Sequence, residues 1–304
     1  MYIIFDTETT GLPKKWNAPY TDTDNWPRCI QIAWQLHDDD GKLIEAKDFL
    51  VQPEGFDIPY DSERIHGIST LLAETEGIPL KDVLEEFNEA LAKAKFVVGQ
   101  NVGFDVNVMG CEFVREEFDT AMHDMPVLDT CTETTAELCK IPGGRGGKFK
   151  LPTLTELHEH LFNVPFAEAH NATADVEATT RCFFELVRRR IFTAEELQIE
   201  ESYFEQFLRE NPDVIQPAGL KHENLKAKSA ALKEEHSEDE GVSQAEIEEG
   251  LAQLKDTSFV HLHNHTQFSV LQSTADIKNL ISKTAEHNMP AVALTDTGNM
   301  MAAF

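Results

Sequence analysis

Apolar and polar positions alternate through the first half of the chain in blocks typical of an α/β domain. Residues 2–7 form a short apolar run suited to a central buried strand, and residues 30–36 and 43–51 carry two more strand patterns. The turn at Asp39, Asp40 and Gly41 between these two patterns is a good hairpin signal. An antiparallel meander is therefore expected to follow the first strand.

A helix, a strand and a second helix are expected after the meander. Apolar residues recur at helical spacing from Val83 to Leu91, the run at 96–98 predicts a strand, and residues 104–118 again show a helical pattern. A further short strand is expected at 127–129. Four glycines between residues 143 and 147 then break the chain into a loop.

Two more helices are expected to complete this first domain. Thr153 with Glu156 forms a capping-box pattern for a helix through Phe162. A longer helix with an apolar stripe runs to about Arg190. The first domain is therefore predicted over residues 1–192.

The remainder of the chain changes character twice. Residues 193–256 hold local helix signals but little that would form a core, and they are expected to be an acidic, partly helical linker. Residues 257–304 show a strand pattern, a helical pattern and a second strand pattern. That is one βαβ unit, too small to stand alone as an ordinary α/β domain.

Composition is that of a globular protein, but the charge is unusual. The 304 residues are 41% hydrophobic, and no apolar stretch is long enough to cross a bilayer, so no membrane association and a cytoplasmic location are expected. The five cysteines are scattered without a C-x-x-C pair, which favours free thiols. The net charge of −28 argues against tight sequence-independent DNA binding, and residues 193–256, with 17 acids against six bases, contribute much of it.

Two carboxylates stand at the end of the first predicted strand. Asp6 and Glu8 are two apart, so both side chains point to one face of the sheet and could share a hard cation such as Mg²⁺ or Mn²⁺. A D-x-E pair taken alone more often marks a solvated strand end. Here the acids are surrounded by residues against which a terminal nucleotide could lie: Thr7, Thr9, Thr10, Gly11 and Leu12.

Two further acids and a histidine occur where helices are expected to begin. Asp105 follows the predicted strand at 96–98 near a helix start, where it could reach a metal or serve only as a helix cap. Asp175 opens the long helix five residues after His170, which would place His170 on the preceding loop. A histidine in that place could equally be a satisfied loop residue.

The order of these motifs is specific. A D-x-E on the first strand, N-x-x-F-D at a helix start and H-x-x-x-x-D before a C-terminal helix closely resembles the DEDDh exonucleases, the family of the proofreading epsilon subunit of bacterial DNA polymerase III. The segments IHGIS at 65–69 and FKLPTLTELHEHLF at 149–162 also resemble this family. The resemblance covers about residues 1–190, and histidine in the third motif separates it from the DEDDy branch.

This resemblance implies a fold, a cofactor and a chemistry. The fold would be ribonuclease H-like, α/β, with a mixed five-stranded sheet flanked by helices. Asp6, Glu8, Asp105 and Asp175 would bind two divalent cations, Mg²⁺ or Mn²⁺, and His170 would accept the proton of the attacking water. The products would be nucleoside 5′-monophosphates released from a 3′ end.

The resemblance also implies substrate contacts. His66, Asn101 and Phe104 should lie near the terminal nucleotides, although Phe104 could instead anchor its helix in the core. Arg145, Lys148 and Lys150 could contact phosphates from the glycine-rich loop or simply form a solvated loop surface.

The last segment resembles the start of a PHP (polymerase and histidinol phosphatase) domain of the polymerase III alpha subunit. His263 and His265 form its H-x-H pair and Asp296 matches a later acidic position, but Thr297 stands where metal-binding members often have histidine. The later PHP motifs are absent, so we expect an incomplete PHP fragment. We therefore expect the chain to be the N-terminal piece of a longer protein in which a proofreading exonuclease is fused to a polymerase, with a DNA 3′ end as substrate.

Three alternatives remain open. A DEDDh exoribonuclease resembling RNase T would use the same residues on RNA. A non-catalytic tethering module would have kept only the fold, and a PHP-type phosphoesterase would act through the C-terminal histidines.

Overall fold

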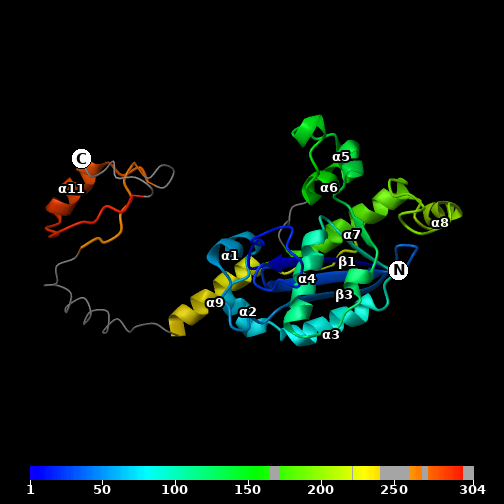
Figure 1. Cartoon of the computed structure of the whole chain (residues 1–304), viewed down its shortest axis with the longest axis horizontal. Coiled ribbons are helices and arrows are strands. Elements are labelled where there is room, and N and C mark those ends of the chain that lie inside the picture. Colours follow the sequence, from blue (N-terminus) through cyan, green and yellow to red (C-terminus); the bar gives the residue numbers. More distant parts are fainter. Residues whose placement is uncertain (165–170, 221, 240–259, 269–272, 297–304) are drawn as a thin grey trace. The chain divides into compact units, whose positions relative to one another are not determined.

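The computed structural model describes residues 1–164, 171–220, 222–239, 260–268 and 273–296. The chain divides into two compact units, Met1–His236 and Ser237–Phe304, which are considered separately (Figure 1). No helix in the described part of the chain combines the length and the apolar character that crossing a membrane requires.

A mixed five-stranded sheet forms the centre of the first unit. Its strands lie in the order β3-β2-β1-β4-β5. The meander is antiparallel, as the sequence predicted, and β4 and β5 run parallel to β1. The strands are β1 Tyr2–Thr9, β2 Cys29–His37, β3 Leu43–Leu50, β4 Phe96–Gly99 and β5 Val127–Asp129.

Helices cover both faces of this sheet because β1 is apolar on both. Ile3 and Phe5 pack on the side of α3 Leu80–Leu91 and α4 Gly103–Arg115. Tyr2 and Ile4 pack on the side of α6 Leu154–Phe162 and α7 Ala172–Arg188. Shorter elements complete the fold: α1 Tyr60–His66, α2 Thr70–Glu76, α5 Glu133–Cys139 and the 3₁₀ turns Met122–Asp124 and Arg145–Gly147.

The described residues within 193–236 belong to the first unit, which differs from the separate linker expected there. The helix α8 Ser202–Glu210 buries Phe204 and Phe207 in the core beside α7. The side chain of Gln206 donates a hydrogen bond to Asp40 in the β2–β3 turn. The sequence prediction missed this packing because the region is acidic overall. The apolar face of α8 is narrow, and the charged residues lie on the opposite side of the helix.

The helix α9 Leu225–Asp239 docks on the turn between α1 and α2. The Ser229 hydroxyl donates to the Gly67 carbonyl at 2.6 Å and accepts from the Ser69 backbone N–H at 3.1 Å. Leu225 is buried in a small apolar cluster with Ile68 and Leu72. A segment about 160 residues away in sequence thus supports the turn that follows His66.

The second unit contains the helix α11 Ile277–Glu286, capped by the Asp276 side chain. In place of the two expected strands, its described residues form an isolated parallel bridge between His261 and Val292. Asp296 accepts hydrogen bonds from the backbone and hydroxyl of Thr266 at 2.6 and 2.7 Å. The residue Thr297 lies outside the described residues.

Substituting Gly67 tests the docking of α9. Gly67 has φ +81°, and an added Cβ would lie 2.8 Å from the Lys226 backbone nitrogen, whereas Gly55 has φ +77° with open space around it. Both substitutions by alanine carry the left-handed cost of about 1–2 kcal/mol. We expect Gly67→Ala to lower the melting temperature of the whole chain clearly more than Gly55→Ala, measured by calorimetry; equal losses would contradict the docking contact.

Candidate active site

The core of the candidate site consists of three carboxylates from two elements. Asp6 and Glu8 continue the face of β1 that Tyr2 and Ile4 begin, so they point toward α7. Asp175 lies in the first turn of α7. Ligand oxygens of Asp6, Glu8 and Asp175 all lie within 4.8 Å of one another, so the structure brings these three predicted residues together.

Asp105 reaches the same strand from the opposite side. It lies in the first turn of α4, is only 4% exposed, and accepts hydrogen bonds from the Thr7 backbone N–H at 3.1 Å and the Thr7 hydroxyl at 2.6 Å. Thr7 points to the α4 side because it stands between Asp6 and Glu8 on an alternating strand. These bonds hold Asp105 beside the strand segment that carries Asp6 and Glu8. Asp105 is not part of the close group formed by these two acids and Asp175.

The surroundings of these acids raise their pKa values and so disfavour the ionised carboxylates. Burial, and then repulsion from Asp105, Asp175 and Glu8, raises the pKa of Asp6 well above its ordinary value. Burial and repulsion raise the pKa of Glu8 to about 8. Burial raises the pKa of Asp105 to about 7, although the Thr7 hydrogen bonds oppose the rise. A divalent cation bound to these oxygens would relieve both causes, and carboxylate oxygens are the ligands that Mg²⁺ and Mn²⁺ prefer.

A fifth carboxylate, Asp129, was not singled out from the sequence. It ends β5 and accepts hydrogen bonds from the backbone N–H groups of Asn101 at 2.8 Å and Cys131 at 2.7 Å. Its charge contributes to the raised pKa of Asp105. The signal was an aspartate at the carboxyl end of a strand parallel to β1 and β4, where polar residues of such sheets meet.

The glycine-containing loop after β1 is tied down by its threonines. The Thr9 hydroxyl donates to the Gly11 carbonyl at 2.8 Å, and the Thr10 hydroxyl accepts from the Arg28 backbone N–H at 3.0 Å. Gly11 has φ +148°, a conformation that favours glycine. Leu12 is 72% exposed beside this loop. The loop therefore offers an ordered backbone with one free apolar side chain.

Other predicted substrate contacts differ in accessibility. The His66 ring is buried, and its Nδ1 accepts from the Ile68 backbone N–H at 3.1 Å. Asn101 is exposed, with a left-handed backbone that directs its N–H to Asp129. The general-base candidate His170 lies outside the described residues. The contacts of His66, Asn101 and His170 with substrate stay predictions.

Phe104 packs on the core as a helix anchor would, while its contact with substrate stays a prediction. It is half-buried against the main core, and its ring centroid lies 5.9 Å from Trp16 and 6.3 Å from Trp26. Trp16 is 60% exposed, so part of this aromatic group faces solvent. Trp16 was missed from the sequence; the signal was a lone tryptophan in the polar segment after FDTETTGL.

Two of the three basic residues of the glycine-rich loop pair with acids. Lys148 forms an ion pair with Glu133 at 2.5 Å, and Lys150 one with Glu156 at 2.7 Å. These contacts favour the interpretation of a solvated loop surface for both lysines over a phosphate-binding role.

Comparisons with known proteins assign two segments of the chain to families. Residues 3–183 match the family model of the RNase T type whose description is Exonuclease, and residues 261–304 match a PHP domain. A PolC-type DNA polymerase III of Streptococcus thermophilus is 31% identical over 189 residues, covering 62% of this chain and 11% of the relative. A DNA polymerase III subunit alpha of Mycobacterium leprae is 46% identical over 50 residues, covering 16% of this chain and 4% of the relative.

Solved structures of exonuclease I have a similar fold. One has a TM-score of 0.50 at 23% identity, covering 65% of this chain and 42% of that chain. Zinc-bound E. coli exonuclease I with single-stranded DNA has a TM-score of 0.50 at 24% identity, covering 67% and 42%. The chain thus spans less than half of these proteins and about a tenth of the PolC-type relatives.

The match over residues 3–183, together with the mixed five-stranded sheet, shows that this chain belongs to the RNase T family of exonucleases, with the DEDDh motifs, and carries a PHP-domain segment after it.

Proposed function

We propose that the chain is a metal-dependent 3′-to-5′ exonuclease that removes nucleoside 5′-monophosphates from DNA 3′ ends. The observation that carries this proposal is the convergence of Asp6, Glu8 and Asp175 within 4.8 Å. The ordered loop after β1 lies beside them, where the 3′ end of a DNA strand could approach. Family membership supports the reaction class.

Asp6, Glu8 and Asp175 would hold divalent cations, two in all, with Asp105 completing the set. Bound Mg²⁺ or Mn²⁺ supplies Lewis acidity toward the phosphodiester and its attacking water. The chain's own part is to keep these carboxylates close together, so that they can give up their protons when cations bind. The exposed Leu12 and Trp16, with Phe104 behind, would receive the terminal bases by stacking and apolar contact.

His170 would take the proton from the attacking water. An unperturbed histidine has a pKa of about 6.5, so it is mostly neutral and able to accept a proton at physiological pH. Its place in the sequence, five residues before Asp175, supports this role.

DNA is the proposed substrate and a polymerase the proposed partner. Exonuclease and polymerase alpha-subunit similarity occur on one polypeptide, and the PolC-type relatives are polymerases. We therefore propose proofreading beside a polymerase fused in the full-length protein, in the cytoplasm. A polymerase that holds the primer-template would offset the weak DNA affinity implied by a net charge of −28.

Chelation tests the reaction class. A 5′-labelled single-stranded DNA should shorten one nucleotide at a time from its 3′ end with Mn²⁺, and EDTA should abolish the activity because the buried carboxylates alone cannot activate water. Asp6→Asn with Glu8→Gln is the inactive control. An RNA oligonucleotide of the same sequence should be cut more slowly; activity that persists in EDTA, or a preference for RNA, would contradict the proposal.

His170→Ala tests the general base. We expect turnover to fall by about two orders of magnitude or more, because positioned acid–base groups contribute factors of this size. Mn²⁺ affinity measured by calorimetry should stay close to that of the unsubstituted chain, since the histidine is not proposed as a ligand. Near-normal turnover would contradict the assignment of His170 as the general base.

The raised pKa values predict a pH dependence of stability. Folding raises the pKa of Glu8 from 4.5 to about 8 and that of Asp105 from 3.8 to about 7, so the folded chain binds more protons than the unfolded one. The resulting stability is present at low pH and is lost as pH rises through the folded values. In EDTA the melting temperature should therefore fall between about pH 7 and pH 8.

Two comparisons control this measurement. His37, His123 and His158 have lowered pKa values and act in the opposite direction, but mainly below their ordinary value of 6.5. Glu8→Gln should reduce the fall, and Mn²⁺ should raise the melting temperature more at the higher pH. A melting temperature that rises over this interval would contradict the electrostatic account.

A further inference from the structure

The first turn of α7 is held by partners outside the helix. A helix begins with four backbone N–H groups that lack partners within it. The Asn171 side chain accepts from Thr173 and Ala174 at 3.1 and 3.4 Å. The Ala172 N–H donates instead to Oε1 of Gln31 on β2 at 3.3 Å. The turn that carries Asp175 is thus bonded directly to the sheet.

Gln31 links this turn to the strand next to the carboxylates. It is 1% exposed and is the cross-strand partner of Glu8. Its Oε1 accepts from Ala172, so its Nε2 faces the Asp48 carboxylate on β3, to which it donates at 2.8 Å. The oxygen and the nitrogen of the Gln31 amide each have a hydrogen-bond partner, and these two bonds fix the orientation of the side chain.

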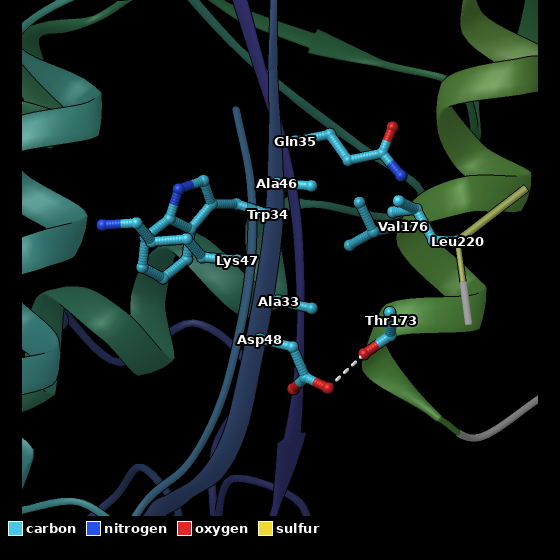
Figure 2. A pocket seen from close by; sticks show the side chains of 9 residues that line it. All are labelled: Ala33, Trp34, Gln35, Ala46, Lys47, Asp48, Thr173, Val176 and Leu220. Carbon is cyan, nitrogen blue, oxygen red and sulfur yellow. Dashed lines mark hydrogen bonds between the residues drawn. The ribbon is translucent and has the colours of Figure 1, made fainter. Parts of the chain in front are cut away.

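Asp48 closes the network. Its second carboxylate oxygen accepts from the Thr173 hydroxyl at 2.6 Å. Figure 2 shows the two side chains pointing toward one another, Asp48 from the sheet and Thr173 from α7. Two sheet residues thus hold two consecutive residues of the helix.

Beside this contact the sheet and α7 leave a hollow. A cavity of about 190 Å³ lies between β2, β3 and α7, lined by Ala33, Ala46, Asp48, Thr173, Val176 and Leu220 among others (Figure 2). Close packing is therefore interrupted where α7 begins on the β3 side. The hydrogen bonds of Asp48 and Gln31 therefore add to the packing of Ala172 in fastening this end of the helix to the sheet.

We infer that Gln31, Asp48 and Thr173 are positioning residues, which hold Asp175 against the repulsion of Asp6 and Glu8 and so preform the cation site. This inference rests on the proposed function. Like-charged carboxylates within 4.8 Å tend to move apart, and the helix start is the movable partner because Asp6 and Glu8 are fixed in the sheet. Groups that orient metal ligands commonly change metal affinity by about 10- to 100-fold.

Thr173→Val tests this inference, since it removes the hydroxyl and keeps the shape. With Mn²⁺ added to the whole folded chain, calorimetry should show about 10-fold weaker binding, and Thr173→Ser should restore it. Thr180→Val is the matched control: Thr180 is on the same helix, is 7% exposed against 8% for Thr173, and its hydroxyl has no hydrogen-bond partner among the described residues. The Mn²⁺ affinity of the Thr180→Val variant should equal that of the unsubstituted chain.

Asp48 tests the same contact from the sheet without altering the helix. Asp48→Ala should weaken Mn²⁺ binding like Thr173→Val. Asp48→Asn, which can still accept from Gln31 and bond Thr173, should retain most of the affinity, which separates positioning from loss of charge.

Two outcomes would overturn the inference. If Thr173→Val and Asp48→Ala lower the melting temperature but leave the Mn²⁺ dissociation constant unchanged, the network serves stability alone. If the unsubstituted chain binds no Mn²⁺, the proposed function itself fails, and the inference fails with it.

Discussion

The burial of several carboxylates side by side, with the repulsion among them, is the constraint on which the rest of this molecule depends. Asp6, Glu8 and Asp175 lie within 4.8 Å of one another, and burial is the largest cause of the raised pKa of both Asp6 and Glu8. Such a cluster opposes folding unless it is protonated or occupied by a cation. The hydrogen bonds around it are best understood as the structure that holds this arrangement in place, with Thr7 fixing Asp105 and the α7 turn fixing Asp175.

One strand makes this arrangement possible. Because side chains alternate along β1, Asp6 and Glu8 face α7 while Thr7 faces α4. The acids of both helices therefore reach one short segment from opposite faces of the sheet. The parallel neighbours β4 and β5 end at the same edge and add Asp129 and the turn at Asn101.

Local periodicity was enough to predict the individual strands and the main helices. The mixed five-stranded sheet and the gathering of Asp6, Glu8 and Asp175 were predicted from the resemblance to the DEDDh exonucleases. The hydrogen bonds that hold these acids in place were not predictable from the sequence, because they join residues far apart in the chain. One example is the bond from the Ala172 N–H to Gln31, 141 positions away. The burial of Phe204 and Phe207 was missed for a different reason, since the acidic residues around them outweigh a narrow apolar face. Trp16 lacked any periodic context, so only its position beside Phe104 in space reveals it.

The central claim is that these buried carboxylates form a cation site, and proton release on metal binding tests it most directly. Mn²⁺ is titrated into the chain at about pH 7 in two buffers with different ionisation enthalpies. The pKa of Glu8, about 8, and that of Asp105, about 7, mean that protons must leave when the ion binds. The account predicts saturable binding with a buffer-dependent heat that reports proton release. Absence of binding, or binding whose heat is the same in both buffers, would contradict it.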